Sequence, residues 1–386
     1  MVKLKLTRAL RKKLKQGNPW VYKDAFQVIK GDSKGKPAFA SMTDPKGEVC
    51  KGVYDPTSRL GFRALNFKSL SVEELKAELN RAYRIRKALR REKTNAYRLI
   101  AGEGDGFSGF ICDVYGGIAV FQFDGEGMER FWLELPMADL VLNLDERIKT
   151  VVLKSRVNKN ELKVLAGDEL ESHIIRFKEN DVTFETDLVK AQKTGFFLDQ
   201  RDNREYVKNL SEGKTVWNIF SYTGGFSVYA GVGGAKKVYS VDISEGAIEQ
   251  SVVNWKINDL FEDGHEGLAC DAFEFLKAEK KLKADVLIVD PPSMTSSRDS
   301  KGMAFKKYVN LFSDAARNVR RGGDLILSSC SSHISFEDFK EIASEALSQA
   351  NKKGRVLRVS GQGLDHPYPH ACEELRYLKF MHINLD

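Results

Sequence analysis

Two residues forty positions apart, Cys330 and Asp290, have the types and local sequences for covalent chemistry. Asp290 ends an apolar run, 284–290, and a Pro-Pro-Ser turn follows, which predicts a buried strand and a tight turn. Cys330 ends a second apolar run, 324–330. Side chains at the carboxyl ends of neighbouring strands of a doubly wound sheet face one pocket. A thiolate beside a carboxyl group suits addition of sulfur to a pyrimidine ring whose edge the acid holds.

The alternative for Cys330 is a small buried apolar residue, which is the common state of a free cysteine. Its Ser-Cys-Ser sequence at a strand end is a poor core sequence and favours the nucleophile. The other cysteines lack such a setting, and we expect them to be inert: Cys50, Cys112, Cys270 and Cys372. Five scattered cysteines without a C-x-x-C pair favour a reducing compartment and predict neither a disulfide framework nor a metal site.

A second motif predicts a nucleotide-like ligand. Gly224 and Gly225 follow a predicted strand, 215–220, and let the backbone approach a ligand closely. Asp242 ends the next strand, where it can bond a ribose diol, and Asp271 can take an adenine amino group. The turn lacks the glycine patterns of nicotinamide and ATP sites, so S-adenosylmethionine, which has no phosphates, fits better. An ordinary tight turn is the alternative.

The elements that would position these residues alternate from residue 181 onward. This alternation predicts a Rossmann-like, mostly parallel, doubly wound sheet over 181–386. The predicted strands are 215–220, 237–242, 284–290, 324–330 and 377–383, and the predicted helices are 244–258, 308–320 and 335–350.

The chain before residue 181 divides into two predicted parts. Residues 1–70 hold short apolar runs broken by Gly and Pro, which predicts a small β-rich domain. Residues 71–180 begin with a connector helix that reaches about residue 92 and continue as a small α/β domain. In that domain, 110–115 and 118–121 flank Gly116-Gly117 and predict a hairpin.

The net charge of +7 is unevenly distributed. Residues 1–98 carry 25 Lys and Arg against nine Asp and Glu, whereas the rest of the chain is acidic. This asymmetry favours a polyanion such as nucleic acid over a merely lysine-rich surface. The amphipathic segment 6–16 carries Arg8, Arg11, Lys12, Lys13 and Lys15. No apolar run is long enough for a membrane span or a signal peptide, so we expect a cytoplasmic protein.

Four motifs in this order carry a family resemblance: 193–201 (KTGFFLDQR), 218–225 (NIFSYTGG), 290–293 (DPPS) and 329–331 (SCS). The chain resembles the bacterial PUA-containing, class I S-adenosylmethionine-dependent 23S rRNA large-subunit (5-methylcytosine) methyltransferases. The stretch 11–20, with Trp20 at its end, is similar to the opening of the family's RNA-binding PUA domain, and 103–106 resembles its central domain. The likeness covers essentially the whole chain.

The resemblance implies roles for individual residues. Phe196, Asp199, Gln200 and Arg201 would line or brace the cofactor pocket. Ser221, Gly224 and Asp242 would hold methionine and ribose, Asp271 would hold adenine, and Asp290 would lie between the cofactor and the base. The neighbours that complete the predicted cofactor set are Asn218, Phe220, Tyr222, Ile243, Ala272 and Pro291.

The resulting prediction is a 5-methylcytosine-forming enzyme with Cys330 as nucleophile at cytosine C6 and Asp290 at the N3/N4 edge. We also consider a homodimer. Two alternatives remain: a related guanine-N7 methyltransferase, which needs no cysteine, and a non-catalytic RNA-binding protein with the same fold. One departure from the family pattern is Ser293-Met294, where the family commonly has Lys-Phe.

Overall fold

The computed structural model describes residues 1–89, 93–156, 161–278, 283–295 and 300–386. The chain folds into two compact units. The first contains Met1–Lys178, Thr186–Leu198 and Leu364–Leu375, and the second contains Glu179–Glu185, Asp199–Gly363 and Arg376–Asp386. The limits of the three predicted domains stay a prediction.

The N-terminal part of the first unit is the expected small β structure. Its sheet has the order β2-β6-β5-β4-β1-β3. The strands are β1 Val2–Leu6, β2 Trp20–Val21, β3 Phe26–Lys30, β4 Ala38–Asp44, β5 Gly47–Tyr54 and β6 Phe62–Ala64. In β1, Val2, Leu4 and Leu6 are buried while the lysines between them are exposed, as the alternation of a half-buried strand requires. Within the amphipathic segment 6–16, Leu6 belongs to β1 and Arg11–Lys15 forms α1.

The central part of the first unit begins with α2, Val72–Ile85, whose N-cap Ser71 accepts a hydrogen bond from the Glu74 backbone. A 3-10 turn, Arg86–Leu89, follows, and the predicted end of the helix at 90–92 lies outside the described residues. The sheet order is β11-β10-β9-β8-β7, with β7 Ala96–Ala101, β8 Phe110–Tyr115, β9 Ile118–Phe123, β10 Thr150–Lys154 and β11 Leu162–Gly167.

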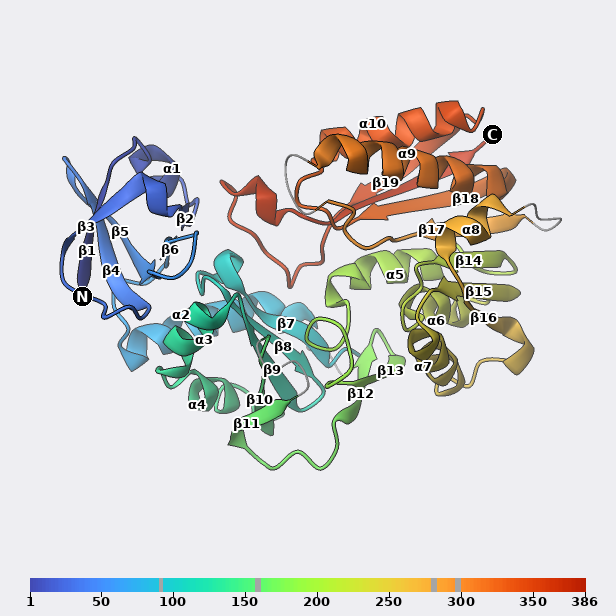
Figure 1. Ribbon diagram of the computed structural model, residues 1–386. Coiled ribbons are helices and arrows are strands. Elements are labelled where there is room, and N and C mark those ends of the chain that lie inside the picture. Colours follow the sequence, from blue (N-terminus) through green and yellow to red (C-terminus); the bar gives the residue numbers. More distant parts are fainter. Residues whose placement is uncertain (90–92, 157–160, 279–282, 296–299) are drawn as a thin grey trace. The chain divides into compact units, whose positions relative to one another are not determined.

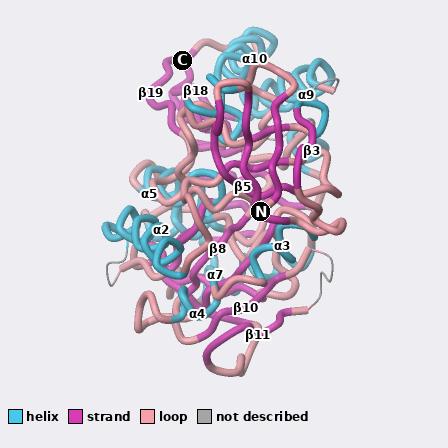
Figure 2. The backbone as a smooth tube through the Cα atoms, turned by 90° about the vertical axis from the view of Figure 1, so that its left-hand side faces the viewer, coloured by secondary structure: helices cyan, strands magenta, loops and turns pink. Residues whose placement is uncertain are grey.

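The predicted hairpin is confirmed, since β8 and β9 pair antiparallel across Gly116-Gly117. Helix α3, Glu126–Leu133, packs on this hairpin, and α4, Met137–Leu142, packs on β10 and β11 (Figure 2). A separate two-stranded sheet follows, made of β12 Ile174–Glu179 and β13 Val182–Asp187.

The second unit contains the expected doubly wound sheet, of order β16-β15-β14-β17-β18-β20-β19. The first five strands are parallel, and β20 is antiparallel to both of its neighbours. The bounds are β14 Thr215–Ile219, β15 Lys237–Asp242, β16 His265–Ala269, β17 Ala284–Val289, β18 Val319–Ser329, β19 Gly354–Ser360 and β20 Lys379–Leu385.

Helices cover both faces of this sheet (Figure 1). One face carries α5 Arg201–Lys208, α6 Gly225–Val232 and α7 Glu245–Lys256, and the other carries α8 Ala272–Lys277, α9 Lys301–Asn318 and α10 Phe336–Gln349. The predicted start of α9 at residue 308 was wrong. Ala304 is buried one turn before Tyr308, so the apolar face of the helix extends further towards its N-terminus.

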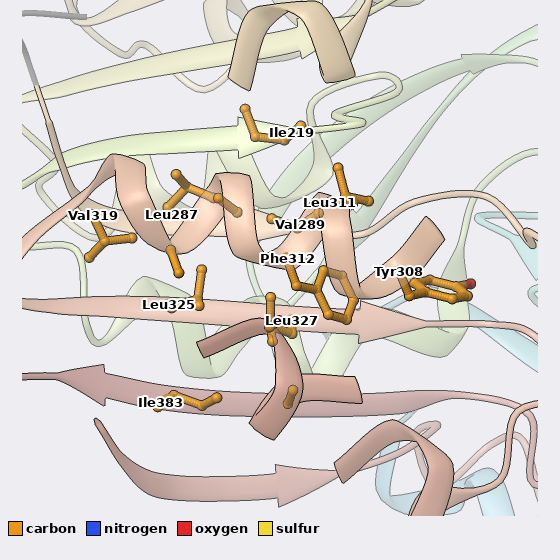
Figure 3. Close-up of a cluster of buried hydrophobic side chains, with 14 of the residues drawn as sticks. Ile219, Leu287, Val289, Tyr308, Leu311, Phe312, Val319, Leu325, Leu327 and Ile383 are labelled. Atoms are coloured by element: carbon orange, nitrogen blue, oxygen red, sulfur yellow. The ribbon is translucent and has the colours of Figure 1, made fainter. Parts of the chain in front are cut away.

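The core on the α9 and α10 side fixes the strands that carry the site. Leu287 and Val289 of β17 and Leu325 and Leu327 of β18 are fully buried. Figure 3 shows these side chains beside α9 residues such as Phe312. Burial of several such side chains, at about 1.5–3 kcal/mol each, holds the ends of the two strands in register.

Candidate active site

The site lies along the carboxyl edge of the parallel strands in the second unit. Beyond the strand ends, three backbone hydrogen bonds still join neighbouring segments: Asp290 N to Ile219 O (3.3 Å), Ser221 N to Val241 O (2.9 Å) and Cys270 N to Asp242 O (3.0 Å). Strands β17 and β18 are parallel neighbours, with Val289 opposite Leu327. The structure therefore confirms the expected arrangement in which Asp290 and Cys330 follow adjacent strands.

The turn after β14 has an unusual backbone. Phe220 and Tyr222 have positive φ angles of 63° and 48°, and Gly224 has a φ of 80°. A Cβ on Gly224 would lie 2.8 Å from the Cβ of Ser251. A positive φ angle at a non-glycine residue costs about 1–3 kcal/mol, and such conformations are typical of ligand-binding turns. A site of this kind agrees with the role predicted for these residues.

The Asp242 carboxylate holds this turn. Its Oδ2 accepts a hydrogen bond from Tyr222 N at 2.9 Å, and its Oδ1 accepts one from Ser244 N at 3.0 Å. A carboxylate oxygen has a second lone pair, so both oxygens can still accept bonds from ribose hydroxyls. Next to it, Ile243 is 76% exposed and offers an apolar surface to a ligand.

Asp271 lies after the neighbouring strand, β16. Its Oδ1 accepts hydrogen bonds from Phe273 N and Glu274 N and thereby caps α8. The Asp271 side chain is exposed, whereas Ala272 is buried. Asp271 is thus held in place by its capping bonds and remains accessible to a ligand.

Two buried polar atoms at the end of β14 provide a test of whether a cofactor fits. Asn218 Oδ1 and Ser221 Oγ make no hydrogen bond to any described residue, although Asn218 Nδ2 donates to Ser227 Oγ at 2.9 Å. Buried polar groups normally have partners. A ligand with polar groups, such as the ammonium and carboxylate of a methionine moiety, would satisfy them, so these residues fit S-adenosylmethionine.

Gln200 joins the predicted cofactor residues to Asp290. Its Nε2 donates to Asp290 Oδ2 and to Ser328 Oγ, both at 3.0 Å. Asn203 Nδ2 donates to Gln200 Oε1 at 2.7 Å and so fixes which way the amide points. These bonds fix the Gln200 side chain beside Asp290, and its role in the cofactor pocket stays a prediction.

The residues on either side of Gln200 are also buried. Asp199 Oδ2 accepts a hydrogen bond from Tyr377 OH at 2.6 Å, and Asp199 O accepts one from Gly363 N. Arg201 is 1% exposed, and its Nε lies 3.7 Å from Asp202 Oδ1.

Cys330 follows β18 and is half-buried, with Sγ 3.9 Å from the carbonyl oxygen of the buried Pro291. Cys270 is half-buried too. At the other three cysteines, burial raises the thiol pKa: to about 12 for Cys50 and Cys372, and well above its usual value for Cys112. A raised pKa keeps these thiols protonated and unreactive at neutral pH.

A polar network beside Cys330 was not predicted from the sequence. Ser331 Oγ bonds to Tyr308 OH (2.8 Å) and Ser293 Oγ (3.0 Å), and burial raises the pKa of Tyr308. Lys379 Nζ donates to Ser331 O (2.6 Å) and Tyr377 O (2.7 Å). The sequence signal for Lys379 was a lysine inside the apolar run of a strand, which is rare unless its charge is compensated.

Several predicted binding residues lie in the first unit. Phe196 is buried there, with its ring centroid 5.3 Å from that of Phe177. The predicted RNA-binding residues differ in their surroundings. Arg8 pairs with Asp24, Arg11 pairs with Asp44, and Trp20 Nε1 donates to Glu103 Oε1. The side chains of Lys12, Lys13 and Lys15 are exposed.

The described part of the chain contains no group of three or more His, Cys, Asp or Glu side chains placed to hold a metal ion. Within the same residues, no helix combines the length and apolar character needed to cross a membrane.

Comparisons with known proteins identify the fold and the family of the chain. Residues 144–348 match the family model of S-adenosylmethionine-dependent methyltransferases, and residues 4–67 match a PUA-like domain. A solved Streptococcus mutans protein described as a SAM-dependent methyltransferase superposes with a TM-score of 0.86 over 100% of both chains at 24% identity. A solved methyltransferase complexed with SAH gives a TM-score of 0.87 at 24% identity, and both likenesses concern the fold alone.

Fold and site thus define an S-adenosylmethionine-dependent methyltransferase with an N-terminal PUA-like domain, and the predicted fold class and cofactor are confirmed. The chain is 32% identical to the Ribosomal RNA large subunit methyltransferase of Deinococcus radiodurans, over 100% of this chain and 98% of the relative. Identity to Ribosomal RNA large subunit methyltransferase I of Photobacterium profundum is also 32%, over 97% of both. The chain belongs to this family of ribosomal RNA large subunit methyltransferases, as the resemblance predicted.

Proposed function

We propose that this chain methylates C5 of a cytosine in large-subunit (23S) ribosomal RNA through a covalent bond between Cys330 and cytosine C6. The observation that carries the proposal is the adjacency of β17 and β18, which are followed directly by Asp290 and Cys330. The turn that fits the cofactor follows β14, whose Ile219 O accepts a hydrogen bond from Asp290 N. The names of the relatives support ribosomal RNA as the substrate class.

The chemistry requires a nucleophile on the protein because cytosine C5 is a weak carbon nucleophile. Attack of the Cys330 thiolate on C6 forms a carbon–sulfur bond and moves the ring's electron pair towards N3, which makes C5 enamine-like. When bound, S-adenosylmethionine would supply an electrophilic methyl group to C5, with cleavage of the methyl–sulfur bond and S-adenosylhomocysteine as the leaving group. Loss of the C5 proton to a base then restores the double bond and expels the thiolate.

Asp290 acts at the N3/N4 edge of the base in this proposal. A carboxylic acid there can protonate N3 as the thiolate adds, provided that its proton is retained near neutral pH. The bond from Gln200 Nε2 to Asp290 Oδ2 fixes the orientation of this carboxyl group.

The remaining predicted residues keep their proposed roles. Asn218, Ser221, Gly224 and Asp242 hold the methionine and ribose parts of the cofactor, and Asp271 holds adenine. The exposed lysines Lys12, Lys13 and Lys15 contact RNA phosphates. The target cytosine must leave its stack to reach Cys330, because the thiol is half-buried.

The decisive experiment is methyl transfer from labelled S-adenosylmethionine to unmodified large-subunit ribosomal RNA, followed by mass spectrometry of the nucleosides. We expect labelled 5-methylcytidine from the wild type and none from Cys330→Ala, while calorimetric cofactor binding stays unchanged. Cys270→Ala, which follows β16 at the same carboxyl edge of the sheet, is the matched control and should stay active. Labelled 7-methylguanosine, or full turnover by Cys330→Ala, would overturn the covalent mechanism.

A mechanism-based probe gives a second readout. In RNA that contains 5-fluorocytidine, the methylated adduct has no C5 proton to lose, so the sulfur cannot be expelled. We expect a denaturation-resistant protein–RNA complex with the wild type and with Cys270→Ala, and none with Cys330→Ala.

A further inference from the structure

Lys379 of β20 is a charged residue that lies beside the proposed nucleophile without a role in the mechanism above. Its side chain is fully buried, at 0% exposure. Its backbone is opposite Ser329 in the β18–β20 ladder, one residue before Cys330. Its Nζ donates to Ser331 O at 2.6 Å and to Tyr377 O at 2.7 Å. The ammonium is therefore fixed at the residue that directly follows the thiol.

Burial of an ammonium group is costly unless an opposite charge compensates it. The two carbonyl oxygens that Lys379 contacts are dipoles without net charge, and a neutral amide could satisfy them equally well. Burial lowers the pKa of Lys379 to about 8, while negative charge on Cys330 and on Asp338 raises it. Asp338 also pairs with Lys301 at 2.8 Å, whereas the backbone of Lys379 lies opposite the residue before Cys330.

The charge interaction between Lys379 and Cys330 affects the protonation of both groups. A thiolate at Cys330 favours the ammonium form of Lys379, and by the same coupling the ammonium favours the thiolate. Free cysteine has a pKa of about 8.5, so only a few per cent of it is thiolate at neutral pH. A nearby lysine is one of the settings known to lower a thiol pKa.

We propose that Lys379 is a positioning residue that keeps Cys330 in its thiolate form, with the lysine ammonium fixed by Ser331 O and Tyr377 O. The proposal rests on the function proposed above, in which Cys330 is the nucleophile. It assigns Lys379 no proton transfer: the ammonium keeps its proton when sulfur adds to C6 and stabilises the thiolate again when sulfur leaves.

The test is the pH dependence of Cys330 alkylation by iodoacetamide in the full chain, without RNA, with Cys330 followed by peptide mass spectrometry. In Lys379→Gln the side chain stays polar and able to donate hydrogen bonds, but the charge is gone. We expect the midpoint of the alkylation profile to rise by about one pH unit, which lowers the alkylation rate near pH 7 by about tenfold. Lys379→Met should behave in the same way.

Lys301→Gln is the matched control, because Lys301 pairs with Asp338 on the same side of the sheet and is 44% exposed. Its profile should match that of the wild type. An unchanged midpoint in folded Lys379→Gln would overturn the role of Lys379. If neither Lys379 variant folds, the wild-type Cys330 midpoint decides: a value at or above that of free cysteine overturns the proposal.

Alkylation and methyl transfer separate the two hypotheses. If Cys330→Ala retains methyl transfer, the proposed function fails whatever the alkylation profile. If Cys330→Ala is inactive but Lys379→Gln leaves the midpoint unchanged, the covalent mechanism stands and the role of Lys379 is wrong.

Discussion

At the scale of single residues, the turn after β14 stores conformational strain where the cofactor fits. Phe220 and Tyr222 lie in the left-handed region, which is unfavourable for residues with a Cβ. The Asp242 carboxylate accepts the Tyr222 N–H and so compensates part of that cost. The turn therefore depends on a side chain from the next strand, and its shape is set before the cofactor binds.

Gly224→Ala tests this turn. Alanine would have to adopt the positive φ of 80° that Gly224 has, and its Cβ would lie 2.8 Å from Ser251 Cβ. We expect the free energy of unfolding to fall by about 1–3 kcal/mol, and cofactor affinity to fall with it. Denaturant unfolding and calorimetric titration of S-adenosylmethionine measure the two effects.

Gly246→Ala in α7 is the matched control. Its new Cβ has no neighbour within 4 Å, and alanine should stabilise the helix by about 0.5–1 kcal/mol. If Gly224→Ala were as stable as this control and bound the cofactor normally, the turn would not be the constrained element described above.

At the scale of elements, strands that are apolar and end in an aspartate were predictable. The bounds of β15 matched exactly, and β14 and β17 ended one residue earlier than expected. Strand β18 begins at Val319, five residues before its predicted start. The prediction missed these residues because the exposed Arg320 and Arg321 interrupt the apolar pattern without ending the strand. Strand β19 was missed, since its exposed residues give no apolar alternation.

The residues of the candidate site that end or closely follow a strand could also be predicted from the sequence. Asp242, Asp271, Asp290 and Cys330 follow local strand patterns, so the sequence reveals them. A lysine inside the apolar run of β20 is a local signal that Lys379 is unusual. Its contact with the turn after Cys330 arises from the antiparallel pairing of β20 with β18, which no local pattern reveals. The network of Tyr308 and Ser331 depends in the same way on the packing of α9 against the sheet.

The edge formed by β16 and α7 should be sensitive to acid through His265. Its ring stacks on Trp255 at 4.9 Å and its Nε2 bonds to Ser240 Oγ at 2.7 Å. Burial, with a smaller contribution from Lys237, lowers the pKa of His265 from 6.5 to about 4. The unfolded chain therefore binds this proton more readily, so stability is full above pH 6.5 and is lost as pH falls towards 4.

His265→Phe keeps a ring against Trp255 but cannot be protonated. We expect its free energy of unfolding to fall less between pH 6.5 and 4, with a difference from the wild type on the order of 2–3 kcal/mol. His173→Phe, at an exposed histidine outside this edge of the sheet, is the control for the same substitution. Urea unfolding at several pH values measures this, and parallel slopes for His265→Phe and the wild type would contradict it.

At the scale of the whole molecule, the order of residues along the chain does not reveal every packing partner. Leu364–Leu375 belongs to the first unit although it follows most of the second. Within the first unit, the buried guanidinium of Arg86 donates to both carboxylate oxygens of Asp105 at 2.6 Å and to Asp365 O at 2.8 Å. A charged pair of this kind is stable only with all of its partners present, so this late segment is part of the unit's structure.

The basic charge of the first 98 residues should determine how the protein binds RNA. Lys12 and Lys13 are exposed, whereas Arg11 pairs with Asp44, so reversal of Arg11 would also break an internal ion pair. Lys12→Glu/Lys13→Glu therefore tests the surface more cleanly. If both lysines contact phosphates, the slope of log affinity against log salt should become shallower by about 1.4–1.8.

The matched control is Lys352→Glu/Lys353→Glu, an adjacent pair in the acidic part of the chain with the same change in net charge. Filter binding of large-subunit ribosomal RNA fragments at several salt concentrations measures both slopes. A change confined to the N-terminal pair places the phosphate contacts on the PUA-like domain, because net charge alone would affect both variants equally. Equal changes in the two variants would mean that the overall charge of the protein controls the affinity for RNA, and that the surface of the PUA-like domain does not.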